Sequence, residues 1–128
     1  MREIKFRVWV KSWKWIDFPT SISIDDSGHI EGVRGYGGDY PYTDIELMQF
    51  TGLHDKNGRE IYKDDIVRVA GVTDPGMKWV VTWSNASWEL HHVLGGNYMN
   101  PMRLGTMSVP IEVVGNIWEN PKLLEASK

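Results

Sequence analysis

The sequence contains no cysteine. Disulfide bonds, zinc sites built on thiolates and thiol nucleophiles are therefore excluded. It also lacks any stretch near the ~18 uninterrupted apolar residues of a membrane-spanning helix. The first ten residues, MREIKFRVWV, are charged from the second position and carry no apolar segment of the kind found in signal peptides. We therefore expect a protein of the cytoplasm that makes no contact with membranes.

The sequence has 14 basic and 17 acidic residues, so its formal net charge is −3. This balance argues against a general phosphate-binding protein. Binding to nucleic acid rests on clustered Lys and Arg. Their distribution is uneven, however, and the first fifteen residues hold a single acidic residue, Glu3, beside five basic ones. A local basic patch therefore stays open as an alternative. Its members would be Arg2, Lys5, Arg7, Lys11 and Lys14.

Large aromatic rings, in contrast, are abundant: seven Trp, five Tyr and three Phe in 128 residues. Each ring can bury ~150–250 Å² of surface. The hydrophobic fraction of 41% and the charged fraction of 24% are ordinary for a soluble globular protein. One domain, or one domain with a small lobe, can therefore form a sizeable core without cross-links.

Short segments with alternating or β-branched residues, separated by turn residues, predict a mainly β protein. Gly, Asn and Asp dominate the connections. An Asn-Pro pair at Asn120 predicts a short helix that closes the chain. Two segments, 35–43 and 95–108, read as loops. Strands are expected near residues 4–9, 14–18, 21–24, 30–34, 66–69, 78–84, 88–94 and 111–117.

The stretch from Leu47 to Val69, LMQFTGLHDKNGREIYKDDIVRV, predicts a β-hairpin with Asn57-Gly58 at its tip. Its acidic residues are those that turns favour. We therefore interpret Asp55, Asp64 and Asp65 as turn formers, not as a paired-carboxylate site.

Aromatic residues near the N-terminus offer two interpretations. Their rings can pack in a core or across a hairpin, which is what aromatic residues in sheets usually do. They can also form an exposed platform for a partner. The candidate partner-binding residues are Trp9, Trp13, Trp15, Tyr36 and Tyr40.

No pattern predicts an enzyme. Glu89 and His91 would share one face of a strand with His92 opposite, but a third or fourth metal ligand is not visible from the spacing. A nucleophile elbow and a phosphate-binding loop are both missing. We therefore expect no catalytic residue, no metal and no cofactor.

Three segments carry a resemblance to a known family: the N-terminal MREIKFRVWV, the central LMQFTGLHDKNGREIYKDDIV and the C-terminal VVGNIWENPKLL. They resemble the YopX family of small proteins encoded by bacteriophages and prophages, mostly of Gram-positive bacteria. The family pattern usually has Gly where this chain has Asp64, so we expect Asp64 to take a left-handed backbone conformation, which Asp tolerates.

The resemblance implies a mainly β fold with an N-terminal β lobe, residues 1–43, and an SH3-like β-barrel part, residues 44–128. It supplies no catalytic residues. Two functions stay open. The first is a protein-interaction or self-assembly module, whose partner is a second copy or another phage or host protein. The alternative is a nucleic-acid-binding accessory protein that uses the basic, Trp-rich N-terminal hairpin.

Overall fold

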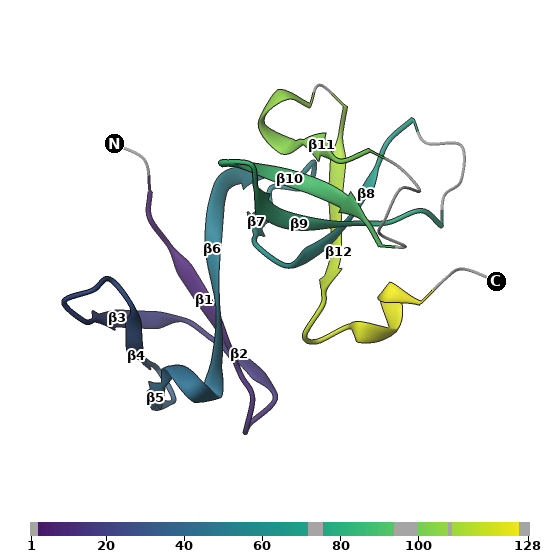
Figure 1. The fold of residues 1–128 in the computed structure, drawn as a ribbon. Coiled ribbons are helices and arrows are strands. Elements are labelled where there is room, and N and C mark those ends of the chain that lie inside the picture. Colours follow the sequence, from purple (N-terminus) through teal and green to yellow (C-terminus); the bar gives the residue numbers. More distant parts are fainter. Residues whose placement is uncertain (1–2, 72–75, 94–99, 108, 126–128) are drawn as a thin grey trace. The chain divides into compact units, whose positions relative to one another are not determined.

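The computed structural model describes residues 3–71, 76–93, 100–107 and 109–125. These residues form a mainly β protein, as the sequence predicts (Figure 1). The strands are β1 (Phe6–Val10), β2 (Trp15–Asp17), β3 (Pro19–Ile24), β4 (Ile30–Gly35), β5 (Gly38–Pro41), β6 (Ile45–His54), β7 (Glu60–Tyr62), β8 (Asp65–Val69), β9 (Trp79–Ser84), β10 (Ser87–His92), β11 (Met102–Arg103) and β12 (Ile111–Asn116). The described residues also form three 3₁₀ turns: η1 (Tyr42–Asp44) and η2 (Leu104–Thr106) between strands, and η3 (Pro121–Leu124) after β12.

Contacts divide the described chain into two compact units, one from Glu3 to Gln49 and one from Phe50 onward. Strand β6 runs through the division: its first half pairs with β1 and its second half with β7. The two domains expected from the sequence, 1–43 and 44–128, stay a prediction, because a compact set of contacts does not by itself define a part that folds alone.

The N-terminal unit consists of two small antiparallel arrangements. Strand β1 lies between β2 and β6, with Val10 opposite both Trp15 and Ile45. Strands β3, β4 and β5 form a three-stranded sheet in that order. Apolar residues from both arrangements meet in one core. Because side chains alternate between the two faces of a strand, each short strand directs its apolar face toward this core. The buried members are Val8, Val10, Val33, Tyr40 and Ile45.

The expected loop at residues 35–43 is wrong in part, because it contains strand β5 and turn η1. Its Gly and Pro content favours turns, but strands pair through their backbones, which composition does not reveal. Strand β5 is an edge strand of its sheet, and an edge strand tolerates a proline such as Pro41. Strand β5 turns Tyr40 inward, where the side chain is 6% exposed.

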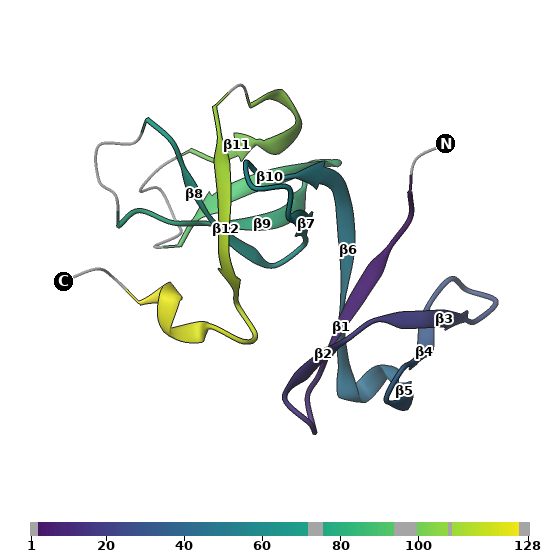
Figure 2. The same cartoon turned by 180° about the vertical axis from the view of Figure 1, so that it is seen from behind.

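The C-terminal unit contains a curled five-stranded sheet in the order β11-β10-β9-β8-β12. Figure 2 shows it from behind, with β12 crossing β9 and β10. Its core gathers mostly β-branched and aromatic residues, which suit a half-buried pleated surface. They are Ile61, Val67, Val69, Trp79, Val81, Leu90, Leu104, Ile111 and Val113.

Three local expectations are refined by this unit. The hairpin of β9 and β10 turns on only two residues, Asn85 and Ala86, both with positive φ. The loop at 95–108 contains β11 and η2, while residues 94–99 and 108 lie outside the described part. The closing helix takes the form of one 3₁₀ turn, and the side chain of Asn120 accepts the Asn116 N–H instead of capping it. Within the described residues, none of the helices is long and apolar enough to cross a membrane.

Candidate functional site

Three of the five candidate partner-binding side chains are exposed on the N-terminal unit. Tyr36 is 82% exposed, Trp13 71% and Trp15 44%. The rings of Trp13 and Trp15 lie 6.2 Å apart between centroids, tilted by 36°. We call Trp13, Trp15 and Tyr36 the aromatic surface. Large rings in water forgo the burial that usually stabilises a fold, so their exposure needs a reason other than folding.

The other two candidates do not belong to this surface. Trp9 lies on β1 and is half-buried. Tyr40 is buried in the core of the same unit. Sequence alternation could not separate these positions, since it shows which residues share a face but not which face meets water.

The hairpin that carries Trp13 and Trp15 is fixed at its tip. Lys14 has a φ of 55°, and its N–H donates to the Val10 carbonyl at 2.7 Å. The backbone N–H of Ser12 donates to Asp44 Oδ1 at 3.0 Å and its hydroxyl to Oδ2 at 2.5 Å. The Lys11 N–H donates to the Asp44 carbonyl at 2.8 Å. These bonds anchor the tip to turn η1, so the backbone that carries the two indole rings is fixed before any partner arrives.

A single buried carboxylate, Asp17, links this hairpin to the β4–β5 turn. The hydroxyl of Tyr40 donates to Asp17 Oδ2 at 2.7 Å, and the Gly37 N–H donates to the same oxygen at 2.9 Å. Asp17 Oδ1 accepts the Phe18 N–H at 2.8 Å and the Tyr36 N–H at 3.3 Å. The carboxylate therefore fixes the backbone that presents Tyr36.

The absence of a side chain at Gly37 lets Trp15 lie against this turn. A Cβ at Gly37 would come within 2.5 Å of Trp15 Cζ2 and closer still to the Tyr40 hydroxyl. Trp15 therefore packs on the turn through one side of its ring and keeps the rest in water.

Hydrogen bonding governs the protonation of this cluster. Burial raises the pKa of Asp17, but the donors Gly37, Tyr40, Phe18 and Tyr36 outweigh it and hold the pKa below its ordinary value of 3.8. Burial raises the pKa of Tyr40, and its hydrogen bond to Asp17 raises it further. Asp17 is thus an anion and Tyr40 a neutral donor at neutral pH, which is the pairing the network requires.

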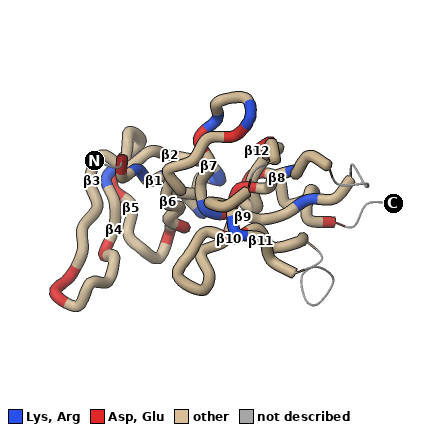
Figure 3. Tube along the Cα trace, turned by 90° about the horizontal axis from the view of Figure 1, so that it is seen from above, with Lys and Arg blue, Asp and Glu red and all other residues tan. Residues whose placement is uncertain are grey.

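The candidate basic residues do not gather around this surface. Lys5 pairs with Glu3 at 2.9 Å and Lys11 with Glu46 at 3.2 Å. Figure 3 shows Lys and Arg interspersed with Asp and Glu along this unit. The remaining three differ in position: Arg7 is buried, Lys14 is exposed at the hairpin tip, and Arg2 lies outside the described residues.

Comparison with known proteins decides the family. The sequence pattern of the family described as "YopX protein" matches residues 5–125. The chain belongs to the YopX family. Among solved structures it is similar to protein EF1440 from Enterococcus faecalis, with a TM-score of 0.71 and 21% identity over 98% of this chain and 100% of that one. It is also similar to YopX from Bacillus subtilis, with a TM-score of 0.64 and 21% identity over the whole of both chains. No curated protein matches the chain.

The acidic residues of the YopX family's central motif stabilise its backbone. Asp55 Oδ1 accepts the N–H groups of Asn57 and Arg59, and Oδ2 accepts the Val113 N–H at 2.9 Å. Burial raises the pKa of Asp55, but these donors outweigh it and lower the pKa below its ordinary value. Asp55 is therefore committed to holding the β6–β7 turn against β12.

Asp64 has a φ of 71°, which confirms the left-handed conformation expected where the YopX pattern has Gly. Its carboxylate accepts the Trp118 indole N–H at 3.0 Å and pairs with Lys63 at 3.1 Å. Asp65 is 1% exposed and accepts the Tyr62 N–H at 2.8 Å. These contacts agree with turn chemistry.

The histidine cluster offers no metal centre in the described part of the chain. His91 Nε2 lies 3.0 Å from Glu89 Oε1, and the His92 ring packs edge-on against Trp79 with centroids 5.5 Å apart. Groups of three or more His, Asp or Glu side chains able to hold an ion are absent from the described residues.

Sequence reasoning missed Asp17, the residue that organises the aromatic surface. Three of its four donors lie 19 to 23 positions away, a spacing that local patterns do not test.

Proposed function

We propose that this YopX family member is a non-enzymatic protein-binding module encoded by a phage or prophage and active in the cytoplasm of a bacterial host. The observation that carries the proposal is the aromatic surface of Trp13, Trp15 and Tyr36, exposed on a backbone that is already fixed.

Exposed Trp and Tyr are the residues on which protein interfaces most often depend, because a large ring removes much water on contact. A rigid backbone beneath these rings also favours binding, since a surface that is ordered before binding loses little conformational entropy on association. The Asp17 network and the tether of Ser12 to Asp44 supply that rigidity.

A binding role without catalysis is supported by how the ionisable side chains are used. Asp17 and Asp55 accept backbone and hydroxyl donors, and Asp64 accepts an indole. A catalytic carboxylate needs a proton-transfer partner in a cleft, and these carboxylates hold turns together. For the C-terminal unit we propose an SH3-like barrel, which the curled antiparallel sheet of β8 to β12 supports.

The nucleic-acid alternative keeps one supporting feature: the exposed Lys14 lies between Trp13 and Trp15 in the sequence, and both indole rings are exposed. Base stacking on aromatic rings near a cation suits single strands. This alternative predicts binding that weakens steeply with salt. The ion pairs of Lys5 and Lys11 make it the weaker of the two proposals.

Photocrosslinking in cells tests the protein-binding role. A benzophenone amino acid replaces Lys14 at the tip, and a control chain carries it at Lys122, which is exposed on the other unit. We expect adducts of defined mass from position 14 that vanish when Trp15 and Tyr36 are changed to Ser. Adducts that are equally strong from both positions, or none from position 14, would contradict a binding surface here. Adducts that disappear on nuclease treatment would support the nucleic-acid alternative.

A further inference from the structure

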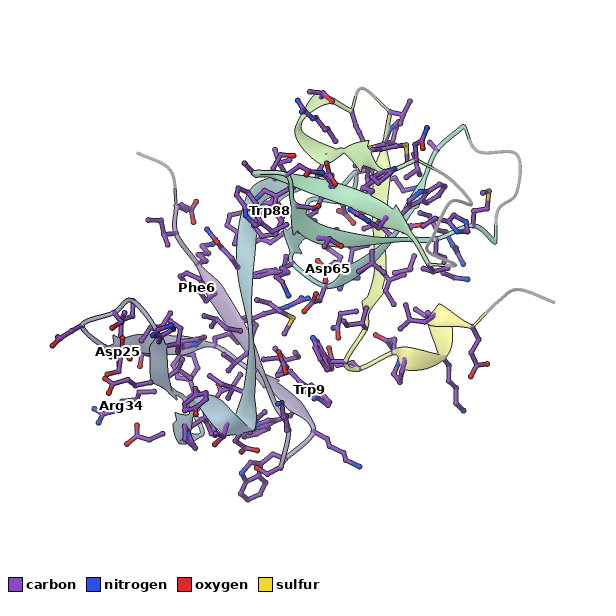
Figure 4. The ribbon with its side chains drawn as sticks, in the orientation of Figure 1. Phe6, Trp9, Asp25, Arg34, Asp65 and Trp88 are labelled. Atoms are coloured by element: carbon purple, nitrogen blue, oxygen red, sulfur yellow. The ribbon has the colours of Figure 1, made fainter. Side chains whose placement is uncertain are left out.

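An acidic hollow lies at the opposite end of β4 from Tyr36. It has a volume of about 760 Å³, within the range of sites that receive a large side chain or ligand. It is lined by Asp25, His29, Ile30, Glu31 and Tyr42. In Figure 4, Asp25 and Trp9 lie on opposite sides of the N-terminal unit.

The chemistry of the hollow is that of a socket for a cation beside an aromatic ring. Asp25 and Glu31 contribute two carboxylates, while the hollow has no Lys or Arg in its described lining. Tyr42 is 62% exposed and Ile30 is half-buried, so an apolar wall stands next to the acidic one. An aromatic ring entering here would displace water from Tyr42 and Ile30.

The tip of the β1–β2 hairpin has the complementary chemistry. Lys14 is exposed, and Trp13 beside it is 71% exposed. The positive φ of Lys14 and the anchor of Ser12 to Asp44 hold both residues at the turn. The tip therefore presents one cation next to one large ring, on a fixed backbone.

The two features do not cover each other within one chain, because Trp13 stays 71% exposed and Tyr42 62% exposed. The hollow takes in Ile30 and Glu31 at the start of β4, whereas the Asp17 network and Trp15 hold its other end, at Gly35 and the following turn. Five residue steps along a strand span about 17 Å. Trp15 and Tyr36 therefore lie toward the other end of β4 from the hollow, whereas Trp13 and Lys14 lie at the tip that Ser12 ties to Asp44 of η1, the turn that also contributes Tyr42 to the hollow. We call Trp13 and Lys14 the plug and the hollow the socket.

We propose that the partner of the aromatic surface is a second copy of this chain, joined head to tail. Trp13 and Lys14 of one copy enter the hollow of the next, with Lys14 facing Asp25 and Glu31 and Trp13 against Tyr42. The proposal rests on the protein-binding role above and names its partner. Because the two surfaces differ, the contact is heterologous and repeats into rings or chains. Charge attraction across it weakens as salt screens it.

Sedimentation velocity on the full chain tests the proposal with a complementary pair of variants. The plug variant carries Trp13→Ala and Lys14→Ala, and the socket variant carries Glu31→Lys. Trp83→Ala is the matched control, since Trp83 is an exposed Trp (54%) on another hairpin. Circular dichroism checks that each variant folds, and Tyr42→Ala replaces the socket variant if Glu31→Lys does not.

We expect the wild-type chain and Trp83→Ala to exceed the monomer mass of 14.7 kDa at micromolar concentration and low salt, and to return toward it in high salt. Each variant alone loses at least about tenfold in affinity, as removal of a central aromatic or charged contact does, and stays monomeric. Mixed together, the two variants form a 1:1 pair and nothing larger, because only one intact plug and one intact socket remain.

A wild-type chain that is monomeric under these conditions overturns the head-to-tail contact, and so does a mixture that stays monomeric while the wild type associates. Neither result removes the protein-binding role if position 14 still crosslinks to a protein of another mass in cells. Absence of that crosslink overturns the protein-binding role itself.

Discussion

At the scale of the residue, Asp17 shows how one carboxylate can serve both folding and surface presentation. Its four donors come from the Phe18, Tyr36 and Gly37 backbone and the Tyr40 hydroxyl. We predict that Asp17→Asn lowers the free energy of unfolding by about 2 kcal/mol near neutral pH, the scale of hydrogen bonds to a charged group. The measurement is urea unfolding, with the exposed Asp26→Asn as control.

The pH dependence of that effect has a definite sign. A carboxyl whose pKa is lower in the folded state contributes stability above its unfolded pKa of about 3.9, and the contribution is lost as the pH falls through the folded value. The difference in free energy of unfolding between the wild-type chain and Asp17→Asn should therefore narrow in acid. Asp55 contributes in the same way to both chains, so its contribution cancels in this difference. A gap that is constant from neutral pH down to strong acid would show that charge on Asp17 is irrelevant.

Ala86 is a second residue with a testable conformation. Its φ of 58° lies in the left-handed region, which costs an L-residue roughly 1–2 kcal/mol and glycine much less. Ala86→Gly should raise the free energy of unfolding by up to about 1 kcal/mol, since it completes the Asn-Gly pair that two-residue hairpins favour. Ala70→Gly, at a position without positive φ, should bring no gain. Equal effects at both positions would refute the strain at residue 86.

Single residues also show what sequence alone can reveal. The left-handed conformation of Asp64 was predictable because the family pattern has Gly there and few residues tolerate that conformation. The buried place of Tyr40 was not, because the Gly- and Pro-rich composition of 35–43 describes turns and conceals a strand held by backbone pairing.

At the scale of the element, two turns share one construction. In Asp25–His29 and in Asp55–Arg59, the first Asp accepts the backbone N–H groups two and four positions on. In both turns the fourth residue is a Gly with positive φ, 85° at Gly28 and 83° at Gly58. The sequence predicts such turns because Asp and Gly are the residues they require. The difference is that only Asp55 also accepts the N–H of Val113, on β12.

That difference makes the two turns controls for each other. Asp55→Ala should expose the Val113 amide and speed its hydrogen exchange, whereas Asp25→Ala should leave that amide protected. The loss of stability should also be larger for Asp55→Ala, because a buried donor loses its acceptor. Equal protection of Val113 in both variants would mean that the tether to β12 is unimportant. Its distance of 58 positions from Asp55 explains why no sequence pattern revealed it.

At the scale of the whole molecule, the same residue type is used in opposite ways. Trp79 is 1% exposed in the core of the C-terminal unit, whereas Trp13 is 71% exposed in the N-terminal unit. Both lie in short β-rich segments, so the alternation that predicts the mainly β fold cannot tell which ring is buried. The fold class, the family and the candidate aromatic residues were therefore accessible from the sequence, whereas the structure was needed to show which of those rings are exposed.

We propose that Trp13 and Tyr36 stay exposed for binding and are not needed for folding. The free energy of unfolding of a Trp13→Ser, Tyr36→Ser variant tests it most directly. We predict a loss below about 1 kcal/mol, as for exposed positions, against about 2–5 kcal/mol for Met48→Ala in the same unit, where Met48 is 0% exposed. A loss for the double variant as large as that of Met48→Ala would show that the rings stabilise the fold, and would contradict the claim.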